Sequence, residues 1–145
     1  MSNVSRGKYV AKKTIEELKR RGFVLVLDAE RKGGGPGRAG AKDFLGLIDF
    51  VAFRPDLPPL FVQCTTEKGF YARRKRFSDA PRKVQKLDAC GTAAIWAWDQ
   101  DRPGGVWYLV REVVVEWDPI IEAPNFLDIR SDMLTSNARL EGDDV

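Results

Sequence analysis

The stretch Phe44–Thr66 reads FLGLIDFVAFRPDLPPLFVQCTT and decides the expected fold, because it holds two apolar segments around a proline-rich turn. The first segment, Phe44 to Phe53, is apolar almost throughout and predicts a strand that Asp49 interrupts. The second segment, Leu60 to Thr66, predicts another strand. Since only the turn Pro55–Pro59 separates the two, we expect an antiparallel hairpin.

A helix and a strand are expected before this hairpin. Residues 5–21 carry a stripe of small and apolar residues at helical spacing (Ala11, Ile15, Leu18 and Gly22), and Gly22 stands where a helix-terminating glycine is typical. Residues 23–27 form a short apolar run that predicts a strand.

Two helices and two strands are expected after the hairpin. The helices are Phe70–Phe77 and Arg82–Cys90, and the strands are Thr92–Trp98 and Val106–Trp117, with a bulge near Arg111-Glu112. This order predicts an α/β fold: a single domain over residues 1–117 with a mixed central β-sheet flanked by helices. Residues 118–145 are expected to form an acidic C-terminal extension that packs on this domain or trails from it.

Composition excludes several kinds of chemistry. The 145 residues are 43% hydrophobic, which is enough for a core, and they include no His. Catalysis by a Ser-His-Asp triad and most zinc sites are therefore excluded. Cys64 and Cys90 are interpreted as reduced thiols of a cytoplasmic protein, and no segment has the apolar length of a membrane span or a signal peptide.

Basic residues concentrate in the first part of the chain. Residues 1–86 contain 20 Lys and Arg against 9 Asp and Glu, whereas residues 87–145 contain 4 against 12. A basic half indicates a polyanionic partner, most often nucleic acid, although a solvated lysine-rich surface gives the same composition.

Asp49 is the first candidate for chemistry, because a carboxylate within an apolar strand is costly unless a cation or hydrogen bonds hold it. Side chains alternate along a strand, so Gln63 and Thr65 share one face of the neighbouring strand. Oxygen ligands of this kind suit Mg²⁺ or Mn²⁺. The alternatives are an Asp at a strand end that bonds local backbone, and a strand end at which Gln63 and Thr65 meet water.

Two basic segments are candidates for phosphate contact. The Gly-rich loop 29–42 contains the letters GxGxxG, but no strand precedes them directly and no helix follows, so we reject a dinucleotide site. The loop is either a basic arm that touches phosphates or a solvated linker. The helix over Phe70–Phe77 is either a second phosphate-binding segment, with Tyr71 stacking on a base or ribose, or a solvated helix face. The expected nucleic-acid contacts are Lys32, Arg38, Lys42, Tyr71, Arg73, Arg74, Lys75 and Arg76.

The order of four segments carries a resemblance to a known family. Arg6-Gly7 and Glu17-Leu-Lys-Arg-Arg-Gly-Phe23 precede Gly46-Leu-Ile-Asp-Phe-Val-Ala52 and Phe61-Val-Gln-Cys-Thr65. In this order they resemble the PD-(D/E)XK (restriction-endonuclease-like) nuclease superfamily, close to archaeal Holliday-junction resolvases and related virus-type modules. They also resemble phage and bacterial relatives whose second motif strand reads Q-x-T and whose late aromatic strand is like Trp96-Ala-Trp98.

The resemblance implies a metal-dependent DNA endonuclease, often a homodimer, with Asp49 as a catalytic metal ligand. The chain departs from the family pattern at three positions: Ala11 stands at the place of the helix Glu, Gln63 at that of the acidic ligand, and Thr65 at that of the catalytic Lys. The implied metal ligands are Asp49, the Gln63 carbonyl and the Cys64 main-chain carbonyl. Lys68 could replace the missing ammonium, and Asp43 or Glu67 could supply a second carboxylate.

Three hypotheses therefore stay open. The first is an endonuclease that uses Mg²⁺ or Mn²⁺; its substrate could be a specific DNA structure such as a four-way junction. The second is a DNA-binding module of the same fold whose chemistry has eroded. The third is a virion or structural protein in which the fold mediates protein contacts only.

Overall fold

Helix α1 (Asn3–Arg20) opens the fold and ends in a Schellman motif. Gly22 N–H donates to the Lys19 carbonyl at 3.0 Å and Phe23 N–H donates to the Leu18 carbonyl at 3.1 Å, which are the two bonds of that motif. Gly22 has a φ of 91°, in the left-handed region that favours glycine, so the predicted helix end is confirmed. Leu18 and Phe23 are buried in one cluster and direct the chain towards the sheet.

The computed structural model describes residues 3–29 and 45–130, and within them six strands form one sheet in the order β1-β2-β3-β4-β5-β6. All neighbours are antiparallel except β3 and β4, which are parallel, so the expected β2–β3 hairpin is confirmed. The strands are β1 Leu25–Asp28, β2 Phe50–Arg54, β3 Leu57–Thr66, β4 Thr92–Gln100, β5 Trp107–Asp118 and β6 Ala123–Asp128.

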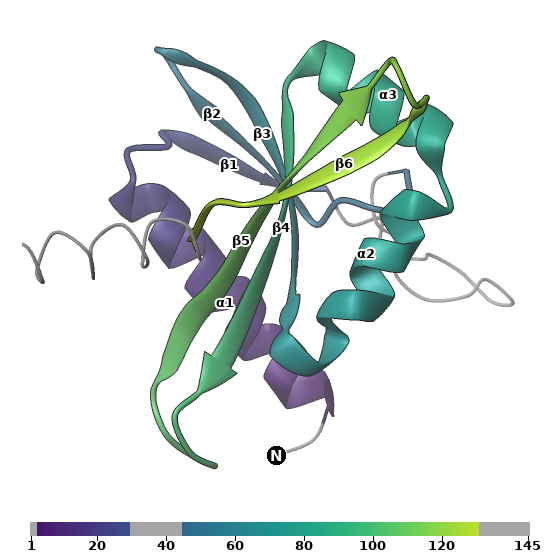
Figure 1. The fold of residues 1–145 in the computed structure, drawn as a ribbon. Coiled ribbons are helices and arrows are strands. Elements are labelled where there is room, and N and C mark those ends of the chain that lie inside the picture. Colours follow the sequence, from purple (N-terminus) through teal and green to yellow (C-terminus); the bar gives the residue numbers. More distant parts are fainter. Residues whose placement is uncertain (1–2, 30–44, 131–145) are drawn as a thin grey trace, which may run out of the picture.

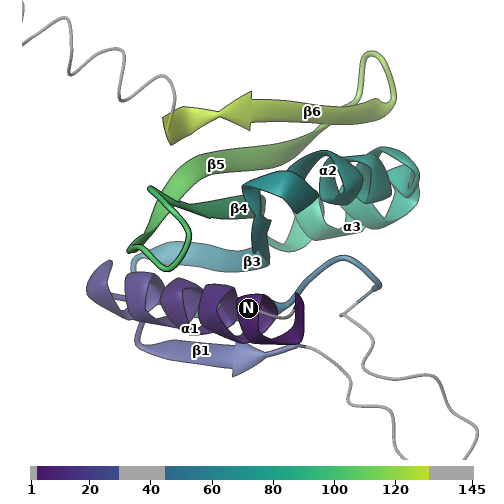
Figure 2. The same cartoon turned by 90° about the horizontal axis from the view of Figure 1, so that it is seen from below.

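Helices cover both faces of the sheet (Figure 1). A parallel strand pair needs a crossover, and the short helix η1 (Glu67–Gly69), α2 (Phe70–Ser78) and α3 (Pro81–Cys90) supply it between β3 and β4. Figure 2 shows α1 on one side of the sheet and the α2–α3 pair on the other. The chain is thus a single α/β domain with a mixed sheet flanked by helices, as expected.

Each helical layer has its own hydrophobic core. The cluster under α1 includes Val10, Leu18, Trp96 and Trp98, and the cluster under α2 and α3 includes Phe70, Phe77, Val84, Leu87 and Ile95. The interpretation of Trp96 and Trp98 as packing residues is confirmed, because they are only 2% and 5% exposed.

The strand predicted over Phe44–Phe53 is shorter than expected. Leu45–Leu47 form a turn, Ile48 makes an isolated bridge, and β2 begins only at Phe50. The positive φ angles of Leu45 (55°) and Gly46 (72°) interrupt the extended backbone there. Asp49 therefore lies at the entry to β2 and not in the middle of a strand.

The far edge of the sheet contains a strand that the sequence patterns do not predict. Strand β6 pairs antiparallel with β5, and Pro124 is compatible with that place because β6 is an edge strand.

The bulge predicted near Arg111-Glu112 lies one residue earlier, at Val110. Ala97 pairs with Arg111 and Trp98 pairs with Leu109, so Val110 has no partner in the β4–β5 ladder.

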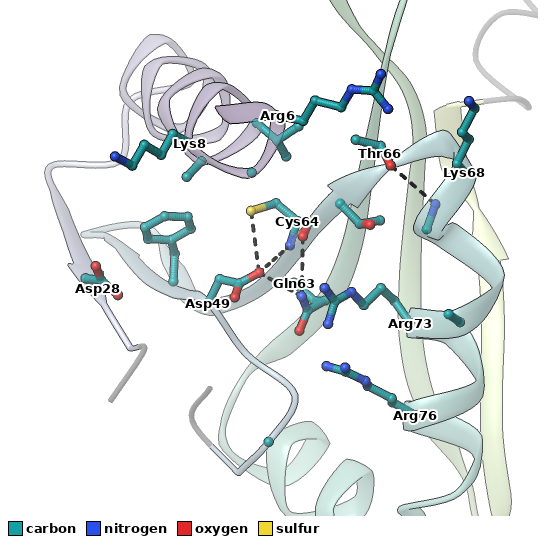
Figure 3. A pocket seen from close by; sticks show the side chains of 18 of the residues that line it. Arg6, Lys8, Asp28, Asp49, Gln63, Cys64, Thr66, Lys68, Arg73 and Arg76 are labelled. Carbon is teal, nitrogen blue, oxygen red and sulfur yellow. Dashed lines mark hydrogen bonds between the residues drawn. The ribbon is translucent and has the colours of Figure 1, made fainter. Parts of the chain in front are cut away.

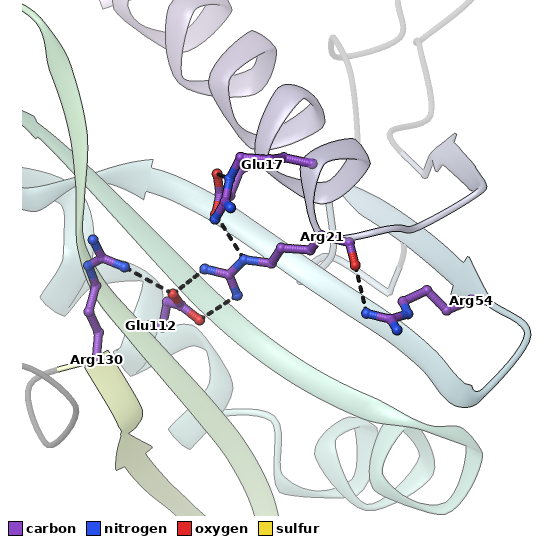
Figure 4. A network of polar contacts seen from close by, with 6 residues as sticks. Glu17, Arg21, Arg54, Glu112 and Arg130 are labelled. Carbon is purple, nitrogen blue, oxygen red and sulfur yellow. Dashed lines mark hydrogen bonds and ion pairs between the residues drawn. The ribbon is translucent and has the colours of Figure 1, made fainter.

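A buried ion pair joins the end of α1 to β5 (Figure 4). Arg21 donates two hydrogen bonds to the Glu112 carboxylate, one of them 2.8 Å long, and its guanidinium lies 4.6 Å from the Trp96 ring centroid. Arg130 adds a bond of 3.3 Å to Glu112, whose side chain is only 4% exposed. The network satisfies a carboxylate that burial would otherwise destabilise.

Among the described residues, no helix combines the length and apolarity of a membrane span.

Candidate functional site

A cleft of about 1210 Å³ lies between the first turns of α1 and the helix α2, and the segment entering β2 and the end of β3 line it as well. Figure 3 shows that the side chains entering it come from all of these elements. Its charged and polar lining includes Arg6, Lys8, Asp28, Asp49, Gln63, Cys64, Thr65, Lys68, Arg73, Arg76 and Lys83. The structure thus brings Asp49, Gln63, Cys64, Thr65 and Lys68 together, which the sequence analysis selected as site residues.

Backbone pairing on both sides fixes the position of Asp49. Its N–H donates to the Val62 carbonyl at 2.9 Å, and its carbonyl accepts from Ala29 N–H at 2.8 Å. Its side-chain Oδ2 accepts from the main-chain N–H of Cys64 at 2.9 Å. The carboxylate is therefore held against β3 by the neighbouring strand and not by its own local backbone.

Gln63 is the closest side-chain partner of Asp49. Its Nε2 donates to Asp49 Oδ2 at 2.8 Å and lies 3.3 Å from the Cys64 carbonyl oxygen. The carboxylate fixes the amide orientation, because a carboxylate accepts hydrogen bonds and repels the amide oxygen. Gln63 is 1% exposed, and its Oε1 has no hydrogen-bond partner among the described residues. A buried acceptor of this kind is costly unless a ligand or cation meets it.

These residues carry oxygens of the kinds that a hard cation accepts, and a cation that replaced Gln63 Nε2 beside Asp49 Oδ2 and the Cys64 carbonyl would require the amide to turn its oxygen to the same point. The orphaned Gln63 Oε1, the Asp49 carboxylate and the Cys64 carbonyl are ligand types that Mg²⁺ accepts, with water completing the shell. Within the described ranges no three His, Cys, Asp or Glu side chains gather as a metal-binding group. A single carboxylate at the centre therefore implies modest affinity.

Cys64 takes part in the site through its main-chain N–H and carbonyl, and its thiol is buried. Its Sγ lies 3.4 Å from Asp49 Oδ2. Burial, and next the negative charge of Asp49, raise the pKa of the Cys64 thiol well above its ordinary value. The raised pKa keeps the thiol protonated at neutral pH, which argues against Cys64 as a nucleophile.

Thr65 is buried and faces the start of α2. A Cβ atom added to Gly69 would lie 2.4 Å from Thr65 Oγ1, so this close approach requires a glycine. Gly69 also donates its N–H to Thr66 Oγ1 at 3.3 Å. These contacts bring the first turn of α2 directly onto the end of β3.

The cations of η1 and α2 point in different directions. In Figure 3, Arg73 and Arg76 extend from α2 towards Gln63 and Asp49, whereas the Lys68 side chain extends away from them. Lys68 lines the cleft as predicted, but its side chain points away from Asp49, whereas that of Arg73 points towards Gln63 and Asp49.

The cleft is strongly basic. Six of its described lining residues are Lys or Arg and two, Asp28 and Asp49, are acidic. Lys83 donates its Nζ to the Leu45 carbonyl at 2.8 Å. The basic side chains come from both α1 and α2, so they stand on both walls of the cleft.

Several predicted contact residues lie outside the cleft. Arg74 stacks over the Phe126 ring at 4.7 Å, Lys75 pairs with Asp79 at 2.8 Å, and Tyr71 is 62% exposed on the surface of α2. Glu67, a candidate second carboxylate, is not in the cleft lining and accepts two hydrogen bonds from Arg111 at 2.8 and 2.9 Å. Lys32, Arg38, Lys42 and Asp43 lie outside the described residues.

Four charged lining residues were not predicted as site residues: Arg6, Lys8, Asp28 and Lys83. Asp28 ends β1 and is the second carboxylate of the described lining; its place directly after an apolar strand was the available signal. Arg6 and Lys8 come from the first turns of α1. Lys8 precedes Ala11 by three residues, so both lie on one helix face, and Ala11 also lines the cleft.

Comparison with protein-family models, with curated proteins and with solved structures gives no match. The site is therefore interpreted from its own residues.

Proposed function

We propose that the chain is a metal-dependent endonuclease that binds DNA in the α1–α2 cleft and cleaves a phosphodiester bond beside Asp49. The observation that carries the proposal is the pair Asp49–Gln63, held at 2.8 Å between adjacent strands in a cleft that is otherwise basic. An acidic and amide oxygen cluster surrounded by cations suits a phosphodiester better than a small neutral substrate.

The arrangement also supports the resemblance to the PD-(D/E)XK superfamily. That resemblance implies that the Asp strand and the next motif strand are adjacent and that the opening helix stands over them. Asp49, Gln63 and Ala11 all line one cleft, which agrees with the places inferred for them.

The residues of the cleft have separable roles in this proposal. Asp49 and the carbonyl oxygens of Gln63 and Cys64 would hold Mg²⁺ or Mn²⁺, which when bound supplies Lewis-acid chemistry and a water of lowered pKa. Arg6 and Lys8 on one wall, with Arg76 on the other, would neutralise backbone phosphates and set the register of the DNA.

A DNA-binding module without cleavage is the second candidate, and one observation favours it. The Gln63 amide donates to the single carboxylate at the centre of the site, which is a complete hydrogen bond without any metal. This candidate predicts DNA binding that depends on salt and does not need a divalent cation.

Supercoiled plasmid and a labelled four-way junction, each incubated in EDTA, Mg²⁺ and Mn²⁺, distinguish these candidates. The proposal predicts cutting in Mg²⁺ or Mn²⁺ alone, its loss in Asp49→Asn, and its retention in Asp88→Asn, which removes an exposed carboxylate on α3. Binding without cutting would favour the module, and neither binding nor cutting would favour a protein that makes only protein contacts. Preference for junction over plasmid would identify a structure-specific enzyme.

A further inference from the structure

The site lacks a cation where the family pattern places one. Thr65 occupies that position, is 8% exposed, and has its hydroxyl against Gly69. A neutral, enclosed hydroxyl cannot stabilise the negative charge that develops on a phosphate during cleavage as an ammonium or guanidinium does. A nuclease with this site needs the charge from another element.

Helix α2 is positioned to supply it. Its buried anchors are Phe70 and Phe77, and the helical spacing puts Arg73 and Arg74 on the two flanks of the side of α2 that these anchors define. The close approach of Gly69 to Thr65 brings the start of α2 against the end of β3. Arg73 is only partly exposed, whereas Arg74, Lys75 and Arg76 are exposed.

The contacts of Arg73 differ from those of its neighbours. Arg74 stacks on Phe126, and Lys75 pairs with Asp79. Arg73 has no hydrogen-bond or ion-pair partner in the described part of the chain, and its guanidinium points towards Gln63 and Asp49 (Figure 3).

We propose that Arg73 is a catalytic residue that takes the place of the missing lysine, its guanidinium contacting a non-bridging oxygen of the scissile phosphate held beside Asp49 and Gln63. This inference rests on the proposed endonuclease function. Guanidinium suits the role, because its planar fork donates two parallel hydrogen bonds to one phosphate.

The step that Arg73 assists is a hydrolysis and needs no further reactant. The oxygen of a water molecule bonds to phosphorus, the bond from phosphorus to one deoxyribose oxygen breaks, and that oxygen takes a proton while the attacking water loses one. No atom is oxidised or reduced. The charge on the non-bridging oxygens grows in the transition state, where Arg73 stabilises it most.

Single-turnover cleavage of a labelled DNA duplex or junction, with binding measured separately by fluorescence anisotropy in Ca²⁺, tests this role. Arg73→Ala is expected to cut roughly 10²–10³-fold more slowly, while its affinity for DNA falls by no more than roughly tenfold, as for one phosphate contact. Added guanidinium ion is expected to restore part of the Arg73→Ala rate, and Arg73→Lys is expected to keep an intermediate rate. A purely structural role would not give rescue by guanidinium.

Two matched variants complete the test. Arg20→Ala removes one positive charge at the end of α1, outside the cleft lining, and is expected to keep the wild-type rate. Lys68→Ala tests the rival assignment and is expected to lose less rate than Arg73→Ala, because Lys68 points away from Asp49. If Arg73→Ala cuts at the wild-type rate, or if Lys68→Ala shows the large loss instead, the Arg73 assignment is wrong while the endonuclease stands. If the wild-type protein itself does not cut, the endonuclease proposal fails and the role of Arg73 fails with it.

Discussion

Nε2 of Gln63 lies 2.8 Å from Oδ2 of Asp49, and the other end of the same amide, Oε1, is buried without a partner in the described chain. The amide of Gln63 thus donates to the carboxylate through its nitrogen, and its oxygen stays buried without a partner. This relationship explains how Asp49 is tolerated at the base of a cleft, and a cation that replaced Nε2 on the carboxylate would let the amide turn its oxygen to the same ion.

Replacement of Gln63 by Glu tests whether this oxygen pair is a cation site. Without metal, two carboxylates at this spacing repel, so Gln63→Glu is expected to lower the free energy of unfolding by about 1–3 kcal/mol. With Mg²⁺ the added charge is expected to raise cation affinity at least roughly tenfold. Thermal unfolding across a Mg²⁺ titration measures both effects, since a ligand of the native state raises the Tm. If the Tm of Gln63→Glu does not change across the Mg²⁺ titration, this oxygen pair is not a cation site.

Gly69→Ala tests the contact that brings α2 onto the site. Gly69 has φ −88° and ψ −4°, a backbone that suits alanine, so only the 2.4 Å approach to Thr65 Oγ1 opposes the new Cβ. Overpacking of this kind is expected to cost about 1–3 kcal/mol in urea unfolding, and the cost should shrink in a Thr65→Ala background. The control Gly7→Ala meets nothing within 4 Å and should be neutral or stabilising. Equal stability of both alanine variants would show that the approach is not required.

Among the ion pairs of the described residues, we expect the Arg21–Glu112 pair to cost the most stability when one partner is replaced. Arg21→Met leaves a carboxylate that is 4% exposed without its main partner, so we expect a loss of about 3 kcal/mol. The double variant Arg21→Met/Glu112→Leu should recover most of this loss, because no unpaired charge remains. Urea unfolding measures both, with the exposed pair Lys75–Asp79 as a control worth less than about 1 kcal/mol. A double variant as unstable as the single one would mean that packing, and not charge, is lost.

Stability in acid should depend on Glu17. Hydrogen bonding from Arg20, with a further contribution from Arg21, lowers the Glu17 pKa from 4.5 to about 2. Because the folded pKa lies below the unfolded one, the carboxylate adds stability that is fully present above about pH 5 and is lost as the pH falls towards 2. Because solvent screens the exposed Arg20, we expect the Glu17 carboxylate to add only about 1–2 kcal/mol to the free energy of unfolding. The stability difference between wild type and Glu17→Gln, measured by urea unfolding, should therefore shrink between pH 5 and pH 2; a constant difference would contradict this.

How far the sequence predicts the structure depends on where the deciding contacts lie. Local signals identified α1 and its end at Gly22, the β2–β3 hairpin and the meeting of Asp49 with Gln63, because chain neighbours and strand pairing determine them. Strand β6 was missed because its backbone bonds to β5 hold it, and no strong apolar pattern marks it.

The directions of the cationic side chains could not be predicted from the sequence alone. Lys68 is near Gln63 in the sequence, and Arg73 is ten residues away from it. The docking of α2 through Phe70, Phe77 and Gly69 decides that Arg73 points to Asp49 while Lys68 points away. This docking is a tertiary contact, so the spacing of a motif does not show which cationic side chain points towards Asp49.

The most direct test of the central claim is the single-turnover cleavage rate of wild type and Asp49→Asn in Mg²⁺, on the same labelled DNA and with binding of both proteins verified. The account predicts that both proteins bind, that the wild type cuts, and that Asp49→Asn cuts at least roughly 10²-fold more slowly, because the substitution removes the charged cation ligand. Equal rates in the two proteins, or no cutting by either at saturating DNA, would contradict it.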